Sequence, residues 1–541
     1  MKRLVFTILV IALSVSEIIA GGFFINSLGY LPGQPKVASV DPSIVSFQVV
    51  DAASGKVVFS AAASEIHSQA DVERSVRFAD FSAVSAPGKY YLQAGDTLKS
   101  AAFSIGANVY NDALYTSFRA FYLWRCGTAV EGEHNGVHFS HQACHLNDGW
   151  LDSIGISGQQ KNGTGGWHDA GDHGKYVVNA GITVGMMFMA WEQFNDKLKK
   201  ADFDLPETAP GFPDFLKELK WETDWLLKMA YPDGSGRVSH KLTRTNFEGF
   251  VLPELDTEKR FFTDWTSAAT ADFVAMMAQA ARYFEPYDKA YAKTCLDAAV
   301  SSYNFLTNNP EYKPLRQRFQ TGGYGGRDDD DRLWAAAEMW ETTGNKEYLA
   351  DFEKRLSSMN VKVDEDWDWG NVRNMGTFTY LLSKREGRNA ELLQEVRKQV
   401  VDVANVIVDK ATNDIFARPL GSRYYWGCNG TVARQVLNLQ IANKINPDAR
   451  YVKTALDAVH NIFGRNQYGR SFVTGLGHKP PMHPHDRRSG GDSVADPWPG
   501  YIVGGGNKAT DWKDEEASYT TNEVAINWQA ALVYALAGFM E

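Results

Sequence analysis

The sequence predicts a multidomain protein in which a small immunoglobulin-like β-sandwich precedes a large all-α (α/α)6 barrel. The chain has 541 residues, more than one typical domain holds. Up to about residue 105, short β-rich runs alternate with turn residues. From about residue 108 onward, apolar residues recur with the period of a helix. These observations divide the chain into a β part and an α part.

Residues 1–20 have the features of a signal peptide. Lys2 and Arg3 form a basic start, and the apolar stretch 4–13 is too short to span a bilayer. Cleavage is expected after Ala20, and an uncleaved N-terminal anchor is the alternative. No other stretch is apolar enough to cross a membrane. We therefore expect a secreted protein, extracellular or periplasmic, without a membrane partner.

Residues 21–106 are predicted to form the sandwich. About six short runs rich in β-branched and aromatic residues are separated by turn pairs such as Pro32-Gly33 and Ser54-Gly55. Strands at this spacing are typical of an immunoglobulin-like domain. No pair of acids or group of metal ligands stands out here, so a structural module is expected.

Residues 107–541 are predicted to form the barrel. About twelve helical patterns, which no strand pattern of comparable strength interrupts, are joined by loops of uneven length. They cover residues 110–126, 176–194, 212–229, 267–283, 287–306, 333–342, 346–357, 372–382, 392–408, 432–445, 449–462 and 523–539. The alternation suits two concentric rings of helices. A solenoid would show an internal repeat, and none is visible.

Composition narrows the class of partner. Hydrophobic residues make up 44% of the chain and aromatic residues 13%, which supports a large core and leaves Trp and Tyr for a cleft. The net charge of −10 argues against nucleic acid or an anionic membrane surface. A neutral ligand is compatible with this balance.

The stretch 165–176, GGWHDAGDHGKY, is the strongest candidate site. It places Asp169 and Asp172 three positions apart among small residues. On one helical turn this spacing would point both carboxylates the same way. Paired carboxylates suit general-base work on a water, because each shifts the pKa of the other. A glycine-rich turn with a solvated acid pair is the alternative.

The four cysteines are Cys126, Cys144, Cys295 and Cys428. Outside the cell, a disulfide between Cys126 and Cys144 is the plain expectation. A closed tetrahedral zinc site is the alternative, since His145 follows Cys144 directly and the stretch 165–176 holds another histidine. Spacing alone does not choose between them.

Three loop segments carry unusual residues. Residues 322–331, GGYGGRDDDD, are either a solvated loop or a calcium-binding loop rich in oxygen ligands. Residues 366–370, DWDWG, and 423–430, RYYWGCNG, hold aromatic side chains beside Gly and Asp. Such side chains suit stacking on a flat polar ligand such as a sugar ring, although core packing is the alternative.

Two C-terminal stretches complete the candidate site. Residues 471–487 form a Gly- and Pro-rich loop that ends in HDR, and residues 512–528 read WKDEEASYTTNEVAINW. Glu523 lies near the start of the last predicted helix, where Thr520, Thr521 or Asn522 can act as a cap. Glu523 is either a capping-box glutamate or a carboxylic acid with a raised pKa near aromatic residues.

Together these motifs resemble glycoside hydrolase family 9, the inverting β-1,4-glucanases. The resemblance runs from about Phe24 to the end and includes the immunoglobulin-like domain of one subgroup. GGWHDAGDHGKY resembles the base motif of the family, SFVTGLGHKPPMHPHDR its His/Arg signature and WKDEEASYTTNEVAINWQA its acid signature. The chain departs from the usual pattern at Cys428, Gly506 and Gln529, none of which is a catalytic group.

The resemblance implies roles for individual residues. Asp172 would be the catalytic base, Asp169 its helper in holding the water, and Glu523 the general acid. The other implied active-site residues are His485 and Arg487, around the cleavage point, and the cleft residues Trp369, Trp426, Tyr519 and Trp528.

The resemblance also implies cofactors. It assigns Cys126, Cys144, His145 and His168 to a structural zinc site, which favours zinc over a disulfide. Calcium is expected in many family members, but its ligands cannot be assigned here. No organic cofactor is expected.

The function implied is endo-acting hydrolysis of β-1,4-glucosidic bonds in cellulose or related β-glucans by a monomer. Inversion requires two carboxyl groups about 6.5–9.5 Å apart, and we expect Asp172 and Glu523 to meet this condition. An exo-acting cellodextrinase, cellobiohydrolase or exo-glucosaminidase on the same fold is the first alternative. A non-catalytic glycan-binding protein is the second. The third is a metallohydrolase using His168, Asp169, Asp172, His173 and His485.

Overall fold

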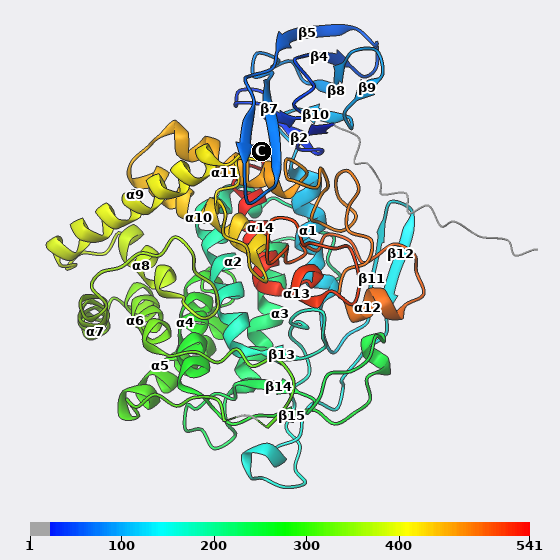
Figure 1. Ribbon diagram of the computed structural model, residues 1–541. Coiled ribbons are helices and arrows are strands. Elements are labelled where there is room, and N and C mark those ends of the chain that lie inside the picture. The colour runs from blue at the N-terminus through cyan, green and yellow to red at the C-terminus, as the bar shows by residue number, and fades with distance from the viewer. Residues whose placement is uncertain (1–21, 317) are drawn as a thin grey trace, which may run out of the picture.

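The computed structural model describes residues 22–316 and 318–541 (Figure 1). The predicted signal peptide, residues 1–20, lies outside the described residues. Within these described ranges, no helix combines the length and the apolar character that crossing a bilayer requires.

The N-terminal part is a sandwich of two sheets, as predicted. One sheet has the strand order β1-β3-β7-β6, and the other has the order β2-β10-β8-β4-β5 with β9 paired to β8. The core between the sheets contains Tyr30, whose ring packs edge-on against Phe81 and Phe103. The strands are β1 (Phe23–Phe24), β2 (Gly29–Tyr30), β3 (Val37–Val40), β4 (Ser46–Asp51), β5 (Val57–Ala62), β6 (His67–Gln69), β7 (Arg74–Asp80), β8 (Gly88–Ala94), β9 (Leu98–Lys99) and β10 (Phe103–Ile105).

The second part is the predicted helical barrel. Its long helices are α1 (Asn111–Leu123), α2 (Val177–Leu198), α3 (Asp214–Met229), α4 (Ser267–Phe284), α5 (Lys289–Asn308), α6 (Asp329–Thr343), α7 (Lys346–Ser358), α8 (Arg373–Leu382), α9 (Ala390–Asn413), α10 (Cys428–Ile445), α11 (Ala449–Ile462) and α14 (Ile526–Ala537). Helices α2, α4, α6 and α8 pack in succession, α10 packs on α14, and α14 packs on α2.

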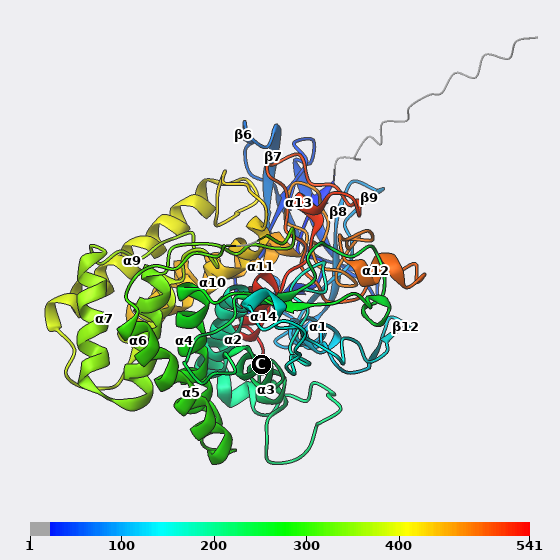
Figure 2. The ribbon, with the colours of Figure 1, turned by 90° about the horizontal axis from the view of Figure 1, so that it is seen from below.

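Each inner helix has an outer partner. Helices α1, α3, α5, α7, α9 and α11 pack on α14, α2, α4, α6, α8 and α10, respectively. Figure 2 shows α5, α7 and α9 near the rim, with α2 and α14 closer to the centre. The long inner helices α2 and α4 are buried along most of their length, as expected for helices enclosed by a second ring.

The acidic run 328–331 forms the N-cap and the first turn of α6, and the prediction of a solvated loop is wrong for this run. Asp328, Asp330 and Asp331 are buried. Asp328 pairs with Arg332 at 2.6 Å, and Asp330 accepts a hydrogen bond of 2.6 Å from the backbone N–H of Val372. Acidic side chains are favourable here because the first turn of a helix carries partial positive charge.

Short strands that the sequence analysis missed lie beside the barrel. β11 (Val130–His134) and β12 (Val137–His141) form a hairpin. β13 (Lys175–Tyr176), β14 (Lys241–Thr243) and β15 (Phe261–Phe262) form a three-stranded antiparallel sheet. Strands of two to five residues contain too few side chains for a clear alternating pattern.

Glu523 precedes the last helix, so the predicted helix 523–539 begins too early. The short helices α12 (Arg487–Gly491) and α13 (Tyr519–Asn522) both precede Glu523 in the chain, and α14 begins only at Ile526. Glu523 has an extended backbone, with φ −72° and ψ 158°. The N-cap of α14 is Ala525, which makes no side-chain cap bond, so the capping interpretation is also wrong.

One attachment of the sandwich to the barrel lies around residue 415. Gln69 donates a hydrogen bond of 3.1 Å to Asp414 and accepts one of 3.0 Å from the backbone N–H of Ile415. The hydroxyl of Ser39 donates to the carbonyl of Ile415 at 2.6 Å. In Figure 1 the sandwich lies above α11. The segment that these bonds hold leads directly to residues 423–430.

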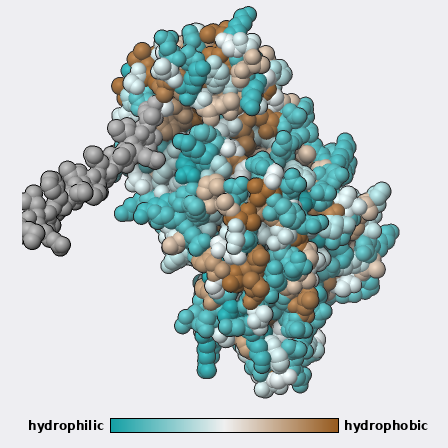
Figure 3. All heavy atoms as spheres, turned by 90° about the vertical axis from the view of Figure 1, so that its right-hand side faces the viewer, coloured by the Kyte–Doolittle hydropathy of each residue, from teal (hydrophilic) through white to brown (hydrophobic). Residues whose placement is uncertain are grey.

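The surface shown in Figure 3 is largely hydrophilic, with a band of hydrophobic residues near its middle. Elsewhere, large apolar side chains are exposed singly, which is normal for a folded protein. Three aromatic exceptions, Phe247, Trp426 and Tyr519, are each 45–51% exposed and belong to the site described next.

Candidate active site

One cavity of about 310 Å³ brings the three predicted catalytic carboxylates together. Asp169, Asp172 and Glu523 line it, although Glu523 is distant from the other two in sequence. Its further lining residues are Ala170, Tyr176, Phe247, Gly322, Gly323, Tyr324, Asp368, Trp369, Trp426, Ala525, Asn527 and Trp528. The cavity therefore combines carboxyl groups with a wall of aromatic rings.

The loop that carries Asp169 and Asp172 is not helical, so the helical-turn prediction is wrong. The backbone N–H of Asp169 donates to the carbonyl of Gly174 at 3.0 Å and closes a tight loop around Asp172. Gly171 allows a close crossing, because a Cβ there would lie 2.2 Å from the carbonyl oxygen of His485. The two carboxylates reach the same cavity through this loop geometry.

Asp172 is held through one oxygen. Its Oδ2 accepts hydrogen bonds from the Tyr176 hydroxyl at 2.8 Å and from the Gly174 N–H at 3.1 Å. Burial raises the pKa of Asp172, as does the negative charge of Glu248, while the positive charge of Arg487 lowers it. Both described hydrogen bonds engage Oδ2, so Oδ1 is the oxygen suited to meet a water.

Asp169 is held through both oxygens. Asn179 donates to Oδ1 at 2.8 Å and the hydroxyl of Tyr324 donates to Oδ2 at 2.5 Å. Burial and the charge of Asp172 raise the pKa of Asp169 well above its usual value, against the effect of these two bonds. Two fixed oxygens make Asp169 a rigid neighbour for Asp172.

Backbone bridges fix the position of Glu523 relative to the acid pair. Ala170 pairs with Ala525 in an antiparallel bridge, and His485 pairs with Glu523 in a parallel one. Burial raises the pKa of Glu523 well above its usual value, and the charges of Asp172 and Asp169 raise it further. A carboxyl group that keeps its proton near neutral pH can serve as a general acid.

His485 and Arg487 lie beside the cavity and are not among its lining residues. The ring of His485 packs between Phe250 and Tyr519, and its Nδ1 lies 2.7 Å from the carbonyl of Glu516. The guanidinium of Arg487 is buried and lies 3.2 Å from a carboxylate oxygen of Glu248. The positive charge of Arg487 lowers the pKa of Asp172 and that of Glu523.

The four predicted cleft aromatics surround the cavity. Trp369, Trp426 and Trp528 line it, and Tyr519 packs edge-on against Trp426 with ring centres 5.5 Å apart. Trp528 is only 7% exposed. By contrast Trp367, from the same DWDWG segment as Trp369, is a core residue.

Sequence reasoning missed several residues of this site. Tyr176 ends the GGWHDAGDHGKY motif and could have been found there, since a phenol is a natural donor to a carboxylate. Tyr324 lies in the GGYGGRDDDD segment, where the run of acids drew attention to calcium instead. Asp368 lies in the DWDWG segment, where the tryptophans drew attention instead, and Phe247 and Glu248 occur in a loop without any distinctive pattern.

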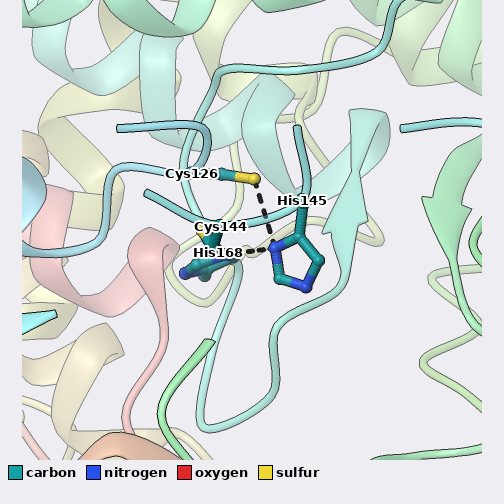
Figure 4. A group of neighbouring side chains, drawn as sticks. All are labelled: Cys126, Cys144, His145 and His168. Atoms are coloured by element: carbon teal, nitrogen blue, oxygen red, sulfur yellow. Dashed lines mark hydrogen bonds between the residues drawn. The ribbon is translucent and has the colours of Figure 1, made fainter. Parts of the chain in front are cut away.

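A second cluster contains the four predicted metal ligands (Figure 4). One donor atom from each of Cys126, Cys144, His145 and His168 lies within 4.8 Å of the others. Among the described residues, these four side chains form the group that is arranged to hold a metal ion. All four cysteines of the chain are free thiols, so Cys126 and Cys144 do not form the disulfide considered above.

The donor distances fit a tetrahedral ion. Sγ of Cys126 lies 3.6 Å from Nδ1 of His145, Sγ of Cys144 lies 3.8 Å from Nε2 of His168, and the two imidazole nitrogens are 3.4 Å apart. Zinc bonds of about 2.3 Å to sulfur and about 2.0 Å to nitrogen give sulfur–nitrogen separations of roughly 3.5 Å and nitrogen–nitrogen separations of roughly 3.3 Å. Asp256 contacts the other nitrogen of His145 at 3.3 Å, a common way to orient a ligating histidine.

Comparison with known proteins identifies the family. The model of glycosyl hydrolase family 9 matches residues 110–536, and the model of the cellulase N-terminal ig-like domain matches residues 21–99. The chain belongs to glycosyl hydrolase family 9. The predicted order of an immunoglobulin-like domain and an (α/α)6 barrel is therefore confirmed. The exact division between residues 106 and 107 stays a prediction.

Relatives within family 9 cover nearly the whole chain. Endoglucanase D of Acetivibrio thermocellus is 53% identical over 95% of this chain and 83% of its own length. The xyloglucan-specific endo-beta-1,4-glucanase BoGH9A of Bacteroides ovatus is 33% identical over 96% of this chain and 93% of its own. A solved structure, Bacteroides ovatus GH9, superposes with a TM-score of 0.89 at 32% identity, covering 96% of this chain and 98% of that one.

Proposed function

We propose that this family 9 enzyme is a secreted endo-acting β-1,4-glucanase that hydrolyses cellulose or related β-glucans with inversion. The observation that carries the proposal is the single cavity in which Asp172 and Glu523 lie with Asp169. Its aromatic wall suits sugar rings, and 53% identity to an endoglucanase supports internal cleavage. We keep residues 21–106 and 107–541 as the two domains of a monomer.

The electrostatics of the three carboxyl groups assign their roles. Three buried carboxyl groups near one another resist full ionisation. The pKa of Asp172 is raised, whereas those of Asp169 and Glu523 are raised well above their usual values. Arg487 lowers the pKa of Asp172 and that of Glu523, and the charges of both aspartates raise the pKa of Glu523. Asp172 is therefore the group to ionise first, and Glu523 the group to keep its proton.

Hydrolysis then proceeds in one displacement. Asp172 removes a proton from the water, Asp169 helps to hold that water, and Glu523 protonates the leaving glycosidic oxygen. The water attacks the anomeric carbon from the face opposite the leaving group, which inverts the configuration. Afterwards Asp172 carries a proton and Glu523 is ionised, and exchange with solvent restores the starting state.

We propose a structural role for zinc. Cys126, Cys144, His145 and His168 supply four protein donors, which fill a tetrahedral shell and leave no position for substrate. His168 immediately precedes Asp169, so a bound ion would stiffen the start of the base loop. The metallohydrolase alternative is therefore less favoured than a stabilising ion.

A product time course tests the function. Wild-type protein and Glu523→Gln are incubated with carboxymethylcellulose and with cellopentaose. A rapid fall in viscosity with few new reducing ends supports the endo-acting proposal. Release of one small sugar with viscosity unchanged would favour the exo-acting alternative. Binding of cellopentaose without hydrolysis by wild-type protein would favour a glycan-binding protein.

A further inference from the structure

A buried lysine holds the loop that carries Tyr324. Lys241 lies on strand β14 and is fully buried. Its ammonium donates to the hydroxyl of Thr321 at 2.9 Å, to the carbonyl of Thr321 at 3.3 Å and to the carbonyl of Gly322 at 2.7 Å. An ammonium has three N–H groups, so these three acceptors satisfy it completely. None of the catalytic steps described above involves this lysine.

The residue before Lys241 binds the next carbonyl of the same loop. Nε2 of His240 lies 2.8 Å from the carbonyl of Gly323, and its Nδ1 lies 2.9 Å from the hydroxyl of Thr266. Burial lowers the pKa of His240 to about 4, so the ring is neutral at pH 7. A carbonyl only accepts, so Nε2 carries the hydrogen that it donates. His240 and Lys241 together bind the three successive carbonyls of residues 321–323.

The 321–324 loop requires such support, because its own sequence does not fix its shape. Tyr324 adopts the left-handed backbone conformation, with φ 43°, which is unfavourable for a residue with a side chain. A Cβ on either neighbour, Gly323 or Gly325, would meet nothing within 4 Å, so close packing does not restrain them. The hydrogen bonds to the preceding carbonyls therefore supply the restraint.

The 321–324 loop reaches both aspartates of the acid pair. The Tyr324 hydroxyl donates directly to Asp169. The N–H of Gly322 donates at 3.1 Å to the hydroxyl of Tyr176, which in turn donates to Asp172. A displaced loop would therefore take a donor from Asp169 and would leave the Tyr176 hydroxyl without its own donor.

Lys241 also supports the base through its charge. Tyr176 on β13 and Lys241 on β14 are paired residues of the antiparallel sheet, and the ammonium lies 5.5 Å from the centre of the Tyr176 ring. Burial lowers the pKa of Lys241 to about 7, and the negative charge of Asp172 opposes this shift. The attraction is mutual, so the ammonium favours the ionised form of Asp172.

We propose that Lys241 is a positioning residue, which holds the 321–324 loop in the place from which Tyr324 orients the acid pair. This inference rests on the proposed function. Lys241 is not among the lining residues of the cavity, so it acts on the reaction through other side chains. Its removal should therefore lower kcat and leave KM for the substrate nearly unchanged.

A double-mutant cycle on kcat tests the inference. Lys241→Met keeps the apolar stem of the side chain and removes the ammonium. With cellopentaose we expect it to lower kcat by about tenfold to a hundredfold, the range for a hydrogen bond to a charged group. In a Tyr324→Phe background the same substitution should lower kcat by at least about threefold less, because the hydroxyl that Lys241 positions is already absent.

The pH profile separates positioning from a general loss of stability. Lys241→Met removes a positive charge near Asp172 and weakens the donation to Asp169, and each change raises the pKa of an aspartate. The acidic limb of the kcat/KM profile should therefore move to higher pH. Lys241→Gln keeps an N–H donor for the loop and is the second variant, should Lys241→Met fail to fold. It is expected to retain more kcat and to show the same dependence on the Tyr324 hydroxyl.

Lys36→Met is the matched control. Lys36 is buried as well, and its ammonium donates to three carbonyls, those of Pro32, Gln34 and Ser82, within the N-terminal sandwich. Its replacement should lower the temperature of unfolding and should leave kcat and the acidic limb as in wild type.

The outcomes distinguish this inference from the proposed function. Suppose that the wild type cleaves cellopentaose, but that the Lys241 variants lose equal kcat with and without the Tyr324 hydroxyl. That result would overturn the inference alone, and so would an equal loss of kcat in Lys36→Met. A wild type that cleaves neither carboxymethylcellulose nor cellopentaose would overturn the proposed function and the inference with it.

Discussion

The hydroxyl group of Tyr324 lies 2.5 Å from Oδ2 of Asp169. The ring of Tyr324 in turn packs edge-on against Tyr176, with ring centres 5.0 Å apart, and Tyr176 binds Asp172. One pair of touching phenols therefore orients both members of the acid pair. The loop of residues 322–324 contributes to this arrangement, since the Gly322 N–H donates to the Tyr176 hydroxyl at 3.1 Å.

Replacing Tyr324 with Phe should change the pH dependence of the enzyme. The Tyr324 hydroxyl lowers the pKa of Asp169, so its removal raises that pKa further. In the proposed mechanism Asp169 holds the water in its ionised form, so the acidic limb of the kcat/KM profile should move to higher pH. Tyr312→Phe is the control, because Tyr312 lies in the same connecting segment and donates only to the carbonyl of Gly326. An identical profile for wild type and Tyr324→Phe would contradict the prediction.

The two proposed catalytic groups should respond differently to the leaving group. Asp172→Asn and Glu523→Gln should each lower turnover of cellopentaose by roughly 10²–10⁴-fold. With a dinitrophenyl cellobioside, whose leaving group needs no proton, Glu523→Gln should recover most of its activity and Asp172→Asn should not. Steady-state kinetics on both substrates measure this, and equal recovery of the two variants would reverse or remove the assigned roles.

The alkaline limb of the pH profile should belong to Glu523. Its pKa is raised, and the proposed mechanism requires its protonated form, so activity should persist at neutral pH and fall as the pH rises through this pKa. On the dinitrophenyl substrate the alkaline limb should be absent from Glu523→Gln. Retention of the same limb in that variant would assign it to another group.

Zinc should bind in one equivalent and should stabilise the protein. We expect Cys126→Ser to lose the metal and to unfold at lower temperature, because two imidazoles and one thiolate bind zinc less strongly than the full set. Elemental analysis and thermal denaturation measure both effects. Cys428→Ser is the control, since Cys428 contacts the Gly506 carbonyl and is remote from the cluster. A full zinc content in Cys126→Ser would contradict the assignment.

Any side chain at position 430 should collide with Trp528. A Cβ at Gly430 would lie 2.4 Å from Cδ1 of Trp528, so Gly430→Ala should displace the indole and raise KM for cellopentaose. Gly370→Ala, next to Trp369 in the chain, is the matched control, since a Cβ there meets nothing within 4 Å. Kinetics that do not distinguish the two variants would show that the position of Trp528 has no effect on substrate binding.

The sandwich should support the cleft through Gln69. Gln69→Ala removes hydrogen bonds to Asp414 and Ile415, with an expected loss of about 1–3 kcal/mol in the free energy of unfolding. Denaturant titration measures the loss. Gln93→Ala is the comparison, because Gln93 binds only the nearby Gly95 carbonyl at the surface. A smaller loss for Gln69→Ala than for Gln93→Ala would contradict a supporting role.

Long periodic segments and dense motifs were predictable from sequence. The helix at residues 449–462 was placed correctly to the residue, because its apolar positions follow one face closely. The acid pair, Glu523 and the Cys/His group were selected from motifs whose residues converge in space. In both cases the information lies in a short stretch of the sequence or in the resemblance of its motifs to the family.

Features that depend on distant contacts were not predictable. The extended backbone at Glu523 results from bridges to segments around residues 170, 485 and 503, which local propensity does not register. The acidic run at 328–331 was misinterpreted because its partners Arg332 and Val372 bury it. Tyr324 contacts Asp169 only because the barrel brings its loop to the same cavity.

The bridge between Ala170 and Ala525 also has a consequence for biosynthesis. The proposed base, Asp172, is made early in translation, and the proposed acid, Glu523, follows about 350 residues later. With these roles, a growing chain should have no hydrolytic activity until residue 523 has been made and its segment has docked beside residue 170. Synthesis itself should therefore delay the activity, and we expect any chain interrupted before that point to be inert toward glucan however well its earlier helices fold.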